Sequence, residues 1–139
     1  MTLDLSSLDQ SIDSLKRALH VSDQNTKNLS SDLTETLRAG VIQNFEVTYE
    51  LCWKFMQRWI RTNKTPEDVD LLRTRKDLFR MAAKYELINN PEVWFDYGNA
   101  RNLTSHTYNK TQADVIYSLA HSFLNDAQYL LKQLELRND

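Results

Sequence analysis

Apolar side chains recur every three or four residues along most of the chain, which is the spacing of one face of an α-helix. A first stripe predicts a helix over residues 4–23, with its apolar positions at Leu5, Leu8, Ile12, Leu15 and Leu19. A longer stripe predicts a second helix over residues 31–62, about 48 Å long at about 1.5 Å per residue. Residues 22–31 are polar and end in serines that can cap the second helix.

Both prolines of the chain lie where further helices are expected to begin. Pro66 follows a threonine and Pro91 follows an asparagine, so each has a capping side chain before it and occupies the first helical position, where its missing N–H costs nothing. A third helical region is therefore expected from Pro66 to about Leu87. A fourth is expected from Pro91 to about Tyr108, where polar residues interrupt the pattern.

A last apolar stripe, from Val115 to Leu134, predicts a fifth helix that starts at Asn109 or Thr111. The chain has only two glycines and two prolines among 139 residues, so the tight turns of a hairpin-rich β fold are excluded. This length suits one domain. We therefore predict that residues 1–139 form a single all-α domain, an antiparallel up-and-down helical bundle with four core helices and a shorter fifth.

The charge is unevenly distributed, although the chain as a whole carries a net charge of −2. Residues 51–84 contain nine basic and four acidic side chains, whereas the segments on both sides are acidic. Only this middle segment has a charge balance that attracts phosphates, but its charges are too mixed to identify a nucleic-acid-binding surface. A solvated helix face is the alternative explanation.

A single cysteine excludes an internal disulfide and a cysteine-based metal cluster. The first 20 residues lack the basic and then apolar pattern of a secretory signal, and no apolar run approaches the roughly 18–20 residues that span a bilayer. A cytoplasmic protein that does not contact membranes is therefore expected. The chain also lacks a glycine-rich phosphate loop and a His-Glu-x-x-His pair, and its three histidines lie in different segments, so we expect no metal site.

Several residues with chemical potential are more simply explained by structure. Cys52 lies on the apolar stripe of the second predicted helix and is expected to be a small buried side chain. Glu50 and Lys54 are four residues apart, in the favourable order for an intrahelical ion pair. Aromatic residues that suggest base stacking are expected instead in the core or an interface; they are Trp53, Phe55, Trp59, Trp94 and Phe95.

Residues 100–108, Ala-Arg-Asn-Leu-Thr-Ser-His-Thr-Tyr, combine a cation, an imidazole and a phenol near a predicted helix end. At about 100° per residue, Arg101 and Tyr108 lie within about 20° of each other around the helix, whereas His106 lies about 140° from Arg101. Arg101 and His106 therefore share a site only if the helix ends or distorts near Ser105, or if a second subunit presents its own copy across a two-fold axis.

The sequence from Arg101 through Asn102 to His106 resembles the Arg-x4-6-His signature of HEPN domains. Its extension to Tyr108 resembles the Arg-x4-His-x-Tyr form of the HepT toxins, which act in HEPN/minimal-nucleotidyltransferase systems. Residues 42–54, Ile-Gln-Asn-Phe-Glu-Val-Thr-Tyr-Glu-Leu-Cys-Trp-Lys, resemble the second helix of the nucleotidyltransferase substrate-binding-protein branch of that family. Together with helix order and length, the resemblance covers most of the chain.

The resemblance implies a dimeric helical bundle that cleaves RNA without a metal cofactor, using two copies of this segment around a shared cleft. His106 would be the general base or acid for a 2′-hydroxyl that attacks its own phosphodiester, and Arg101 would balance charge on the phosphoryl oxygens. Asn102, Thr104 and Ser105 would position the substrate, which is expected to be single-stranded RNA.

The resemblance also implies that a partner minimal nucleotidyltransferase silences the toxin by transferring AMP from ATP onto Tyr108. Magnesium and ATP would then belong to the partner, and the added anion would block RNA. Two alternatives stay open at this point. In the first, the chain is a non-catalytic subunit that supplies half of a nucleotide-binding cleft to a nucleotidyltransferase, and it resembles the helical domain of some antibiotic nucleotidyltransferases. In the second, the chain is a purely structural dimeric bundle.

Overall fold

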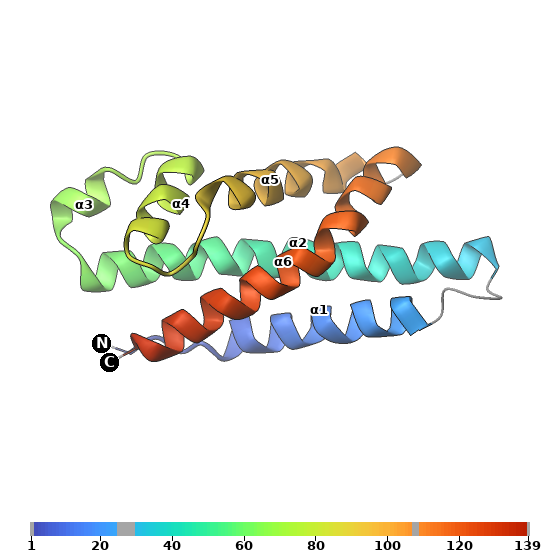
Figure 1. The fold of residues 1–139 in the computed structure, drawn as a ribbon, viewed down its shortest axis with the longest axis horizontal. Coiled ribbons are helices and arrows are strands. Elements are labelled where there is room, and N and C mark those ends of the chain that lie inside the picture. The colour runs from blue at the N-terminus through green and yellow to red at the C-terminus, as the bar shows by residue number, and fades with distance from the viewer. Residues whose placement is uncertain (1, 25–29, 107–108, 139) are drawn as a thin grey trace.

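The computed structural model describes residues 2–24, 30–106 and 109–138, and every regular element in these residues is helical (Figure 1). The elements, in chain order, are α1 (Ser6–Gln24), α2 (Ser31–Asn63), α3 (Pro66–Asp70), α4 (Arg75–Lys84), α5 (Pro91–Asn102), the 3₁₀-helix η1 (Leu103–His106) and α6 (Lys110–Leu136). The helices α1, α2, α5 and α6 run in alternating directions along the long axis of the molecule. The predicted all-α, antiparallel up-and-down bundle is therefore confirmed.

Side-chain caps fix the predicted helix starts. The hydroxyl of Ser30 accepts a hydrogen bond from the Leu33 amide at the start of α2, and the hydroxyl of Thr65 accepts one from the Asp68 amide at the start of α3. Asn90 caps α5, whose first residue is the expected proline, and Asn109 caps α6. Because each cap satisfies an amide that has no partner within its helix, the polar segments of the sequence place these boundaries.

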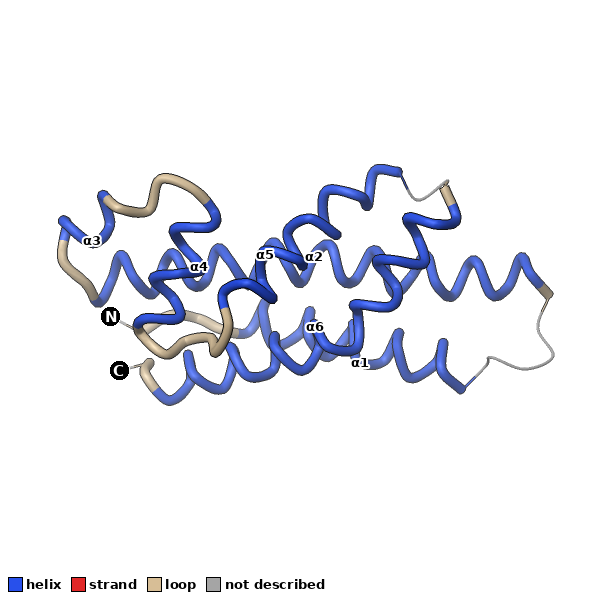
Figure 2. The backbone as a smooth tube through the Cα atoms, turned by 45° about the horizontal axis from the view of Figure 1, so that its top comes forward, coloured by secondary structure: helices blue, strands red, loops and turns tan. Residues whose placement is uncertain are grey.

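The prediction of one helical region from Pro66 to about Leu87 was wrong, because two separate helices occupy this segment. Thr74 is in an extended conformation, accepts a hydrogen bond from the Asp77 amide at 3.1 Å and donates its own amide to the Asp77 carboxylate at 3.2 Å. This reciprocal pair caps the start of α4, which is separate from α3 because α3 already ends at Asp70. Figure 2 shows α3 and α4 beside the C-terminal end of α2.

Buried side chains from α1, α2, α4, α5 and α6 form one core, and an aromatic cluster lies at its centre. The ring of Phe123 is 4.8 Å from that of Phe45 and 5.1 Å from that of Tyr97, in edge-on geometry in both cases. Cys52 is fully buried, as predicted. Of the aromatic residues considered for base stacking, three are buried in this core, namely Phe55, Trp59 and Trp94. The other two, Trp53 and Phe95, only partly join it.

The two ends of the described chain lie together. The amide of Leu3 donates to the Asn138 side chain at 2.8 Å, and the Asn138 amide group donates to the Leu3 carbonyl at 2.9 Å. This pair lies at the end of the bundle opposite η1 (Figure 1).

Candidate functional site

Helix α5 ends at Asn102, and the chain continues as the 3₁₀-helix η1 up to His106. The α-helix therefore stops three residues before Ser105, and the expectation that it continues to about Tyr108 was wrong. Hydroxyl groups donate further hydrogen bonds to carbonyls at this helix end. Thr104 Oγ1 donates to the Arg101 carbonyl at 2.7 Å, and Ser105 Oγ donates to the Asn102 carbonyl at 3.4 Å.

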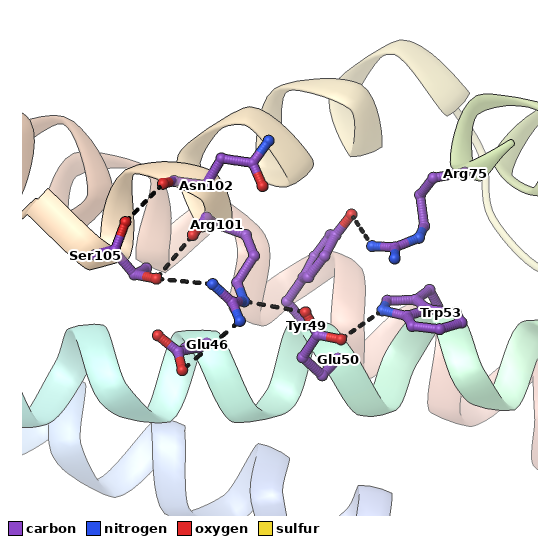
Figure 3. Close-up of polar contacts among 9 residues, drawn as sticks. Glu46, Tyr49, Glu50, Trp53, Arg75, Arg101, Asn102 and Ser105 are labelled. Atoms are coloured by element: carbon purple, nitrogen blue, oxygen red, sulfur yellow. Dashed lines mark hydrogen bonds and ion pairs between the residues drawn. The ribbon is translucent and has the colours of Figure 1, made fainter.

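Arg101 lies at the centre of a polar network between α5, η1 and α2 (Figure 3). Its Nε atom donates to Glu50 Oε1 at 3.0 Å, and a terminal nitrogen donates to Thr104 Oγ1 at 3.0 Å. The other terminal nitrogen lies 3.8 Å from Glu46 Oε1. The side chain is 30% exposed, so solvent or a ligand can still reach the guanidinium. The network fixes the orientation of Arg101 without removing it from the surface.

Glu50 is held at both carboxylate oxygens. Oε1 accepts from Arg101, and Oε2 accepts from the indole Nε1 of Trp53 at 2.9 Å (Figure 3). The predicted pair of Glu50 with Lys54 is therefore wrong. Lys54 instead lies over the Trp53 ring, 5.7 Å from its centre. Glu50 accepts one charge-assisted hydrogen bond from Arg101 and one hydrogen bond from the Trp53 indole, so its carboxylate is well oriented. Glu50 is therefore a positioning residue for Arg101.

The network continues from Trp53 to the start of α4. The Arg75 guanidinium lies 3.9 Å from the centre of the Trp53 ring and donates to the Tyr49 hydroxyl at 3.2 Å. Burial raises the pKa of Tyr49, and the hydrogen bond from Arg75 acts in the opposite direction. Tyr49 also packs closely on α5, because a Cβ atom at Gly98 would lie 2.8 Å from its hydroxyl oxygen. This glycine allows α5 to approach α2 beside the site.

The other candidate residues lie nearby on the same segment. Asn102 and Ser105 are exposed, and His106 is exposed as the last residue of η1. Thr104 is partly buried and contacts Arg101 directly. Tyr108 lies outside the described residues.

A cleft of about 880 Å³ lies next to this network, between the N-terminal half of α2, η1 and the start of α6. Glu46 and Thr104, which both contact Arg101, line it. Arg38 and Asp114 also line the cleft and form an ion pair of 2.8 Å that joins α2 to α6. The cleft thus combines both signs of charge with the Arg101 network, and its volume is in the range of small-molecule sites.

No three His, Cys, Asp or Glu side chains among residues 2–24, 30–106 and 109–138 are arranged to hold a metal ion. Within the same residues, none of the helices is both long enough and apolar enough to cross a bilayer.

Comparisons with known proteins identify relatives over nearly the full chain. The family described as nucleotidyltransferase substrate binding protein like matches residues 3–136. A Haemophilus influenzae protein named probable ribonuclease HepT is 36% identical over 138 residues, which cover 98% of this chain and 94% of the relative.

Solved structures show the same fold. A Haemophilus influenzae structure, described as revealing the fold of a substrate binding domain of a nucleotidyltransferase, matches with a TM-score of 0.87 and 35% identity, covering 95% of this chain and 99% of the other. A structure from Thermus thermophilus matches with a TM-score of 0.71 and 22% identity over 91% and 98% of the two chains, and it supports the fold alone.

Proposed function

Because this chain belongs to the nucleotidyltransferase substrate binding protein-like family, as a HepT-like member, we propose that it is an endoribonuclease toxin controlled by a nucleotidyltransferase partner. One observation carries the proposal. Arg101 is oriented by Glu50 at 3.0 Å and by Thr104 at 3.0 Å, yet it stays partly exposed at the start of the short segment that ends in the exposed His106.

The proposed reaction is an attack of an RNA 2′-hydroxyl on its own phosphodiester. His106 removes the 2′-hydroxyl proton while the bond from O2′ to phosphorus forms and the bond from phosphorus to O5′ breaks, and the leaving O5′ takes up a proton from solvent water. Arg101 donates hydrogen bonds to the phosphoryl oxygens as negative charge grows on them. Thr104 orients Arg101, and Asn102 and Ser105 contact the RNA.

The proposal includes a homodimer with two copies of this segment around one cleft. A two-fold interface is self-complementary, so the Arg101 and His106 of each chain would face those of the other. Sedimentation equilibrium tests this part, because a monomer at all accessible protein concentrations would contradict it.

The main experiment compares RNA cleavage by the purified parent chain, Arg101→Ala and His106→Ala, in the presence of a chelator. Both variants should lose cleavage by about 100-fold or more, since each removes a group that acts in the transition state. Matched controls are Arg17→Ala and His20→Ala, which replace exposed residues of the same types on α1. Circular dichroism should show that all four variants stay folded.

The nuclease assignment fails if Arg101→Ala and His106→Ala cleave RNA as fast as the parent, or if the parent does not cleave RNA. Equal cleavage by the parent and all four variants would assign the activity to a contaminating nuclease, and loss of cleavage in the two control variants as well would show that the loss is not specific to Arg101 and His106.

The regulatory part of the proposal is that the partner transfers AMP from ATP onto Tyr108, with magnesium and ATP bound by the partner. The Tyr108 hydroxyl attacks the α-phosphorus of ATP, pyrophosphate leaves, and the hydroxyl proton goes to a base of the partner. Incubation with the partner, magnesium and ATP should add one AMP to the parent chain and none to Tyr108→Phe, as measured by mass spectrometry of tryptic peptides. Label on another residue would contradict the assignment.

A second function, a non-catalytic nucleotide-binding subunit of a two-component nucleotidyltransferase, is favoured by the cleft of about 880 Å³ beside Arg101. Under this alternative, the chain binds nucleotide only together with its partner and never cleaves RNA. Isothermal titration of ATP into the chain, the partner and their mixture separates the two functions.

A further inference from the structure

The segment formed by α4 and the turn before it is strongly basic. Residues 71–84 contain five basic side chains and one acidic side chain, in a protein whose total charge is −2. The five cations are Arg73, Arg75, Lys76, Arg80 and Lys84. In the described part of the chain, Arg73, Lys76 and Lys84 have no carboxylate oxygen within 4.0 Å, and Arg80 has one, from Asp77, at 3.7 Å. Most of this positive charge is therefore uncompensated.

Three of these cations lie over two partly exposed aromatic rings. The Arg75 guanidinium is 3.9 Å from the centre of the Trp53 ring of α2. Lys76 and Arg80 are 5.4 Å and 5.3 Å from the centre of the Phe95 ring of α5. Cations that alternate with accessible aromatic and guanidinium planes are the usual composition of surfaces that bind single-stranded nucleic acid, since phosphates contact the cations and bases stack on the planes.

Direct contacts join the Trp53 ring to the candidate active site. Arg101 donates to Glu50 at 3.0 Å, Trp53 donates to the same carboxylate at 2.9 Å, and Arg75 stacks on Trp53 (Figure 3). A strand that contacts Arg101 can therefore continue over Trp53 to Arg75 without leaving the protein surface.

The outer face of α4 carries a depression of about 540 Å³. Three cations, Arg73, Arg80 and Lys84, line it together with one carboxylate, Asp77, the buried Met81 and Leu71, which is 57% exposed. A nucleobase has a flat apolar face and is attached to a phosphate, so it matches this combination of an exposed apolar side chain and cations.

We propose that α4, with Trp53 and Phe95, forms a second binding surface for single-stranded RNA that holds the strand beyond Arg101. We call it the α4 surface; it comprises the five cations of residues 71–84 and these two rings. The inference rests on the proposed ribonuclease function. An acidic segment of a protein partner would match the charges alone, whereas RNA also uses the rings and the contact path to Arg101.

The experiment measures binding of fluorescently labelled 2′-O-methyl oligoribonucleotides, which lack the attacking hydroxyl, by fluorescence anisotropy. Two lengths, about four and about twelve nucleotides, separate binding at one site from binding along a surface. The test variant is Lys76→Gln with Arg80→Gln. The matched control is Lys16→Gln with Lys132→Gln, which removes the same charge from exposed positions on α1 and α6.

The test variant should bind the longer oligonucleotide about 10-fold more weakly than the parent. The slope of log Kd against the logarithm of the salt concentration should also be smaller than that of the parent by about one to two. Its affinity for the shorter oligonucleotide should change less. The control variant should behave as the parent with both lengths, and all melting temperatures should agree.

The inference is overturned if the test variant binds the longer oligonucleotide within about twofold of the parent with an unchanged salt slope, or if the parent does not bind it. It is also overturned if the variant keeps RNA binding but no longer associates with the nucleotidyltransferase, because the α4 surface would then serve a protein partner. Cleavage of unmodified RNA by the parent is measured separately, so failure of the ribonuclease proposal is distinguishable from failure of the α4 surface.

Discussion

Arg101 Nε and Glu50 Oε1 lie 3.0 Å apart and join α5 to α2 across 51 positions of sequence. Both side chains are about one-third exposed, with 30% of each accessible, so the pair contributes little to stability. What the contact provides is orientation, because Nε is held from one side while the two terminal nitrogens point towards Thr104 and Glu46. A guanidinium fixed in this way faces an incoming phosphate with little loss of side-chain freedom.

We expect Glu50→Gln to lower kcat for RNA cleavage by about 10-fold, because the neutral amide orients Arg101 less firmly. RNA affinity should stay the same or increase, since the change removes a negative charge beside the phosphate. Steady-state kinetics, with kcat and KM determined separately, checks this combination.

Glu46→Gln is the matched control, because Glu46 lies 3.8 Å from Arg101 and should matter less than Glu50. Equal losses in the two variants, or a lower RNA affinity in Glu50→Gln, would show that Glu50 does not act through the orientation of Arg101.

Gly98→Ala should destabilise the protein. The new Cβ would lie 2.8 Å from the Tyr49 hydroxyl, which is buried between α2, α4 and α5, so a helix or the ring must shift. We expect a loss of about 1–3 kcal/mol in the free energy of unfolding, which outweighs the better helix propensity of alanine. Urea unfolding followed by circular dichroism measures it.

Gly40→Ala is the matched control on α2, because a Cβ there meets no atom within 4 Å. It should stabilise the protein by about 0.5–1 kcal/mol through helix propensity alone. Stabilisation by both substitutions would contradict the close approach of α5 to Tyr49.

Stability should fall in alkaline solution. Burial and the Asp126 carboxylate, which accepts a hydrogen bond from the Tyr97 hydroxyl, raise the pKa of Tyr97. Above about pH 10 the unfolded chain loses this proton while the folded chain keeps it, so the unfolded state binds fewer protons and the free energy of unfolding decreases as pH rises.

The variant Tyr97→Phe checks this assignment. It should lower the free energy of unfolding near neutral pH by about 1–2 kcal/mol, because a buried hydrogen bond is lost. Its further decrease above about pH 10 should be smaller than that of the parent. Urea unfolding at both pH values measures the difference, and identical alkaline decreases in the two proteins would contradict it.

The Cys52 thiol should be unreactive in the native protein. It is fully buried, and burial raises its pKa, so neither access nor the thiolate form is available to a disulfide reagent such as DTNB. Labelling should become rapid and reach one thiol per chain in denaturant. Rapid labelling of the native protein would place Cys52 at the surface.

The helix order was predictable because the apolar stripes and the caps at Asn90 and Asn109 are local signals. The division between α3 and α4 was missed, since apolar residues continue through the break and conceal it. The relevant signal was Thr74, three residues before Asp77, which is the spacing of a reciprocal helix cap.

The sequence identified Arg101 as a candidate but not what holds it. Glu50 was assigned to Lys54, its neighbour on the same helix, because sequence spacing reveals only local pairs. The contact with Arg101 depends on how α5 packs on α2, and that packing needs Gly98, whose role is visible only once the helices are placed. The one available hint was that Glu46 and Glu50 are also four apart, and two carboxylates on one helix face need a cation.

The pairing of Leu3 with Asn138 has a practical consequence for work on this protein. Both described chain ends lie at the same end of the bundle as α4, and the segment with Arg101 lies towards the other end, so an affinity tag or fluorescent protein fused at either end stays away from Arg101 but lies near the α4 surface (Figure 1). A short peptide joining residues 2 and 138 would also give a cyclic chain. Circularly permuted variants could then have their new ends in the polar stretch before α2.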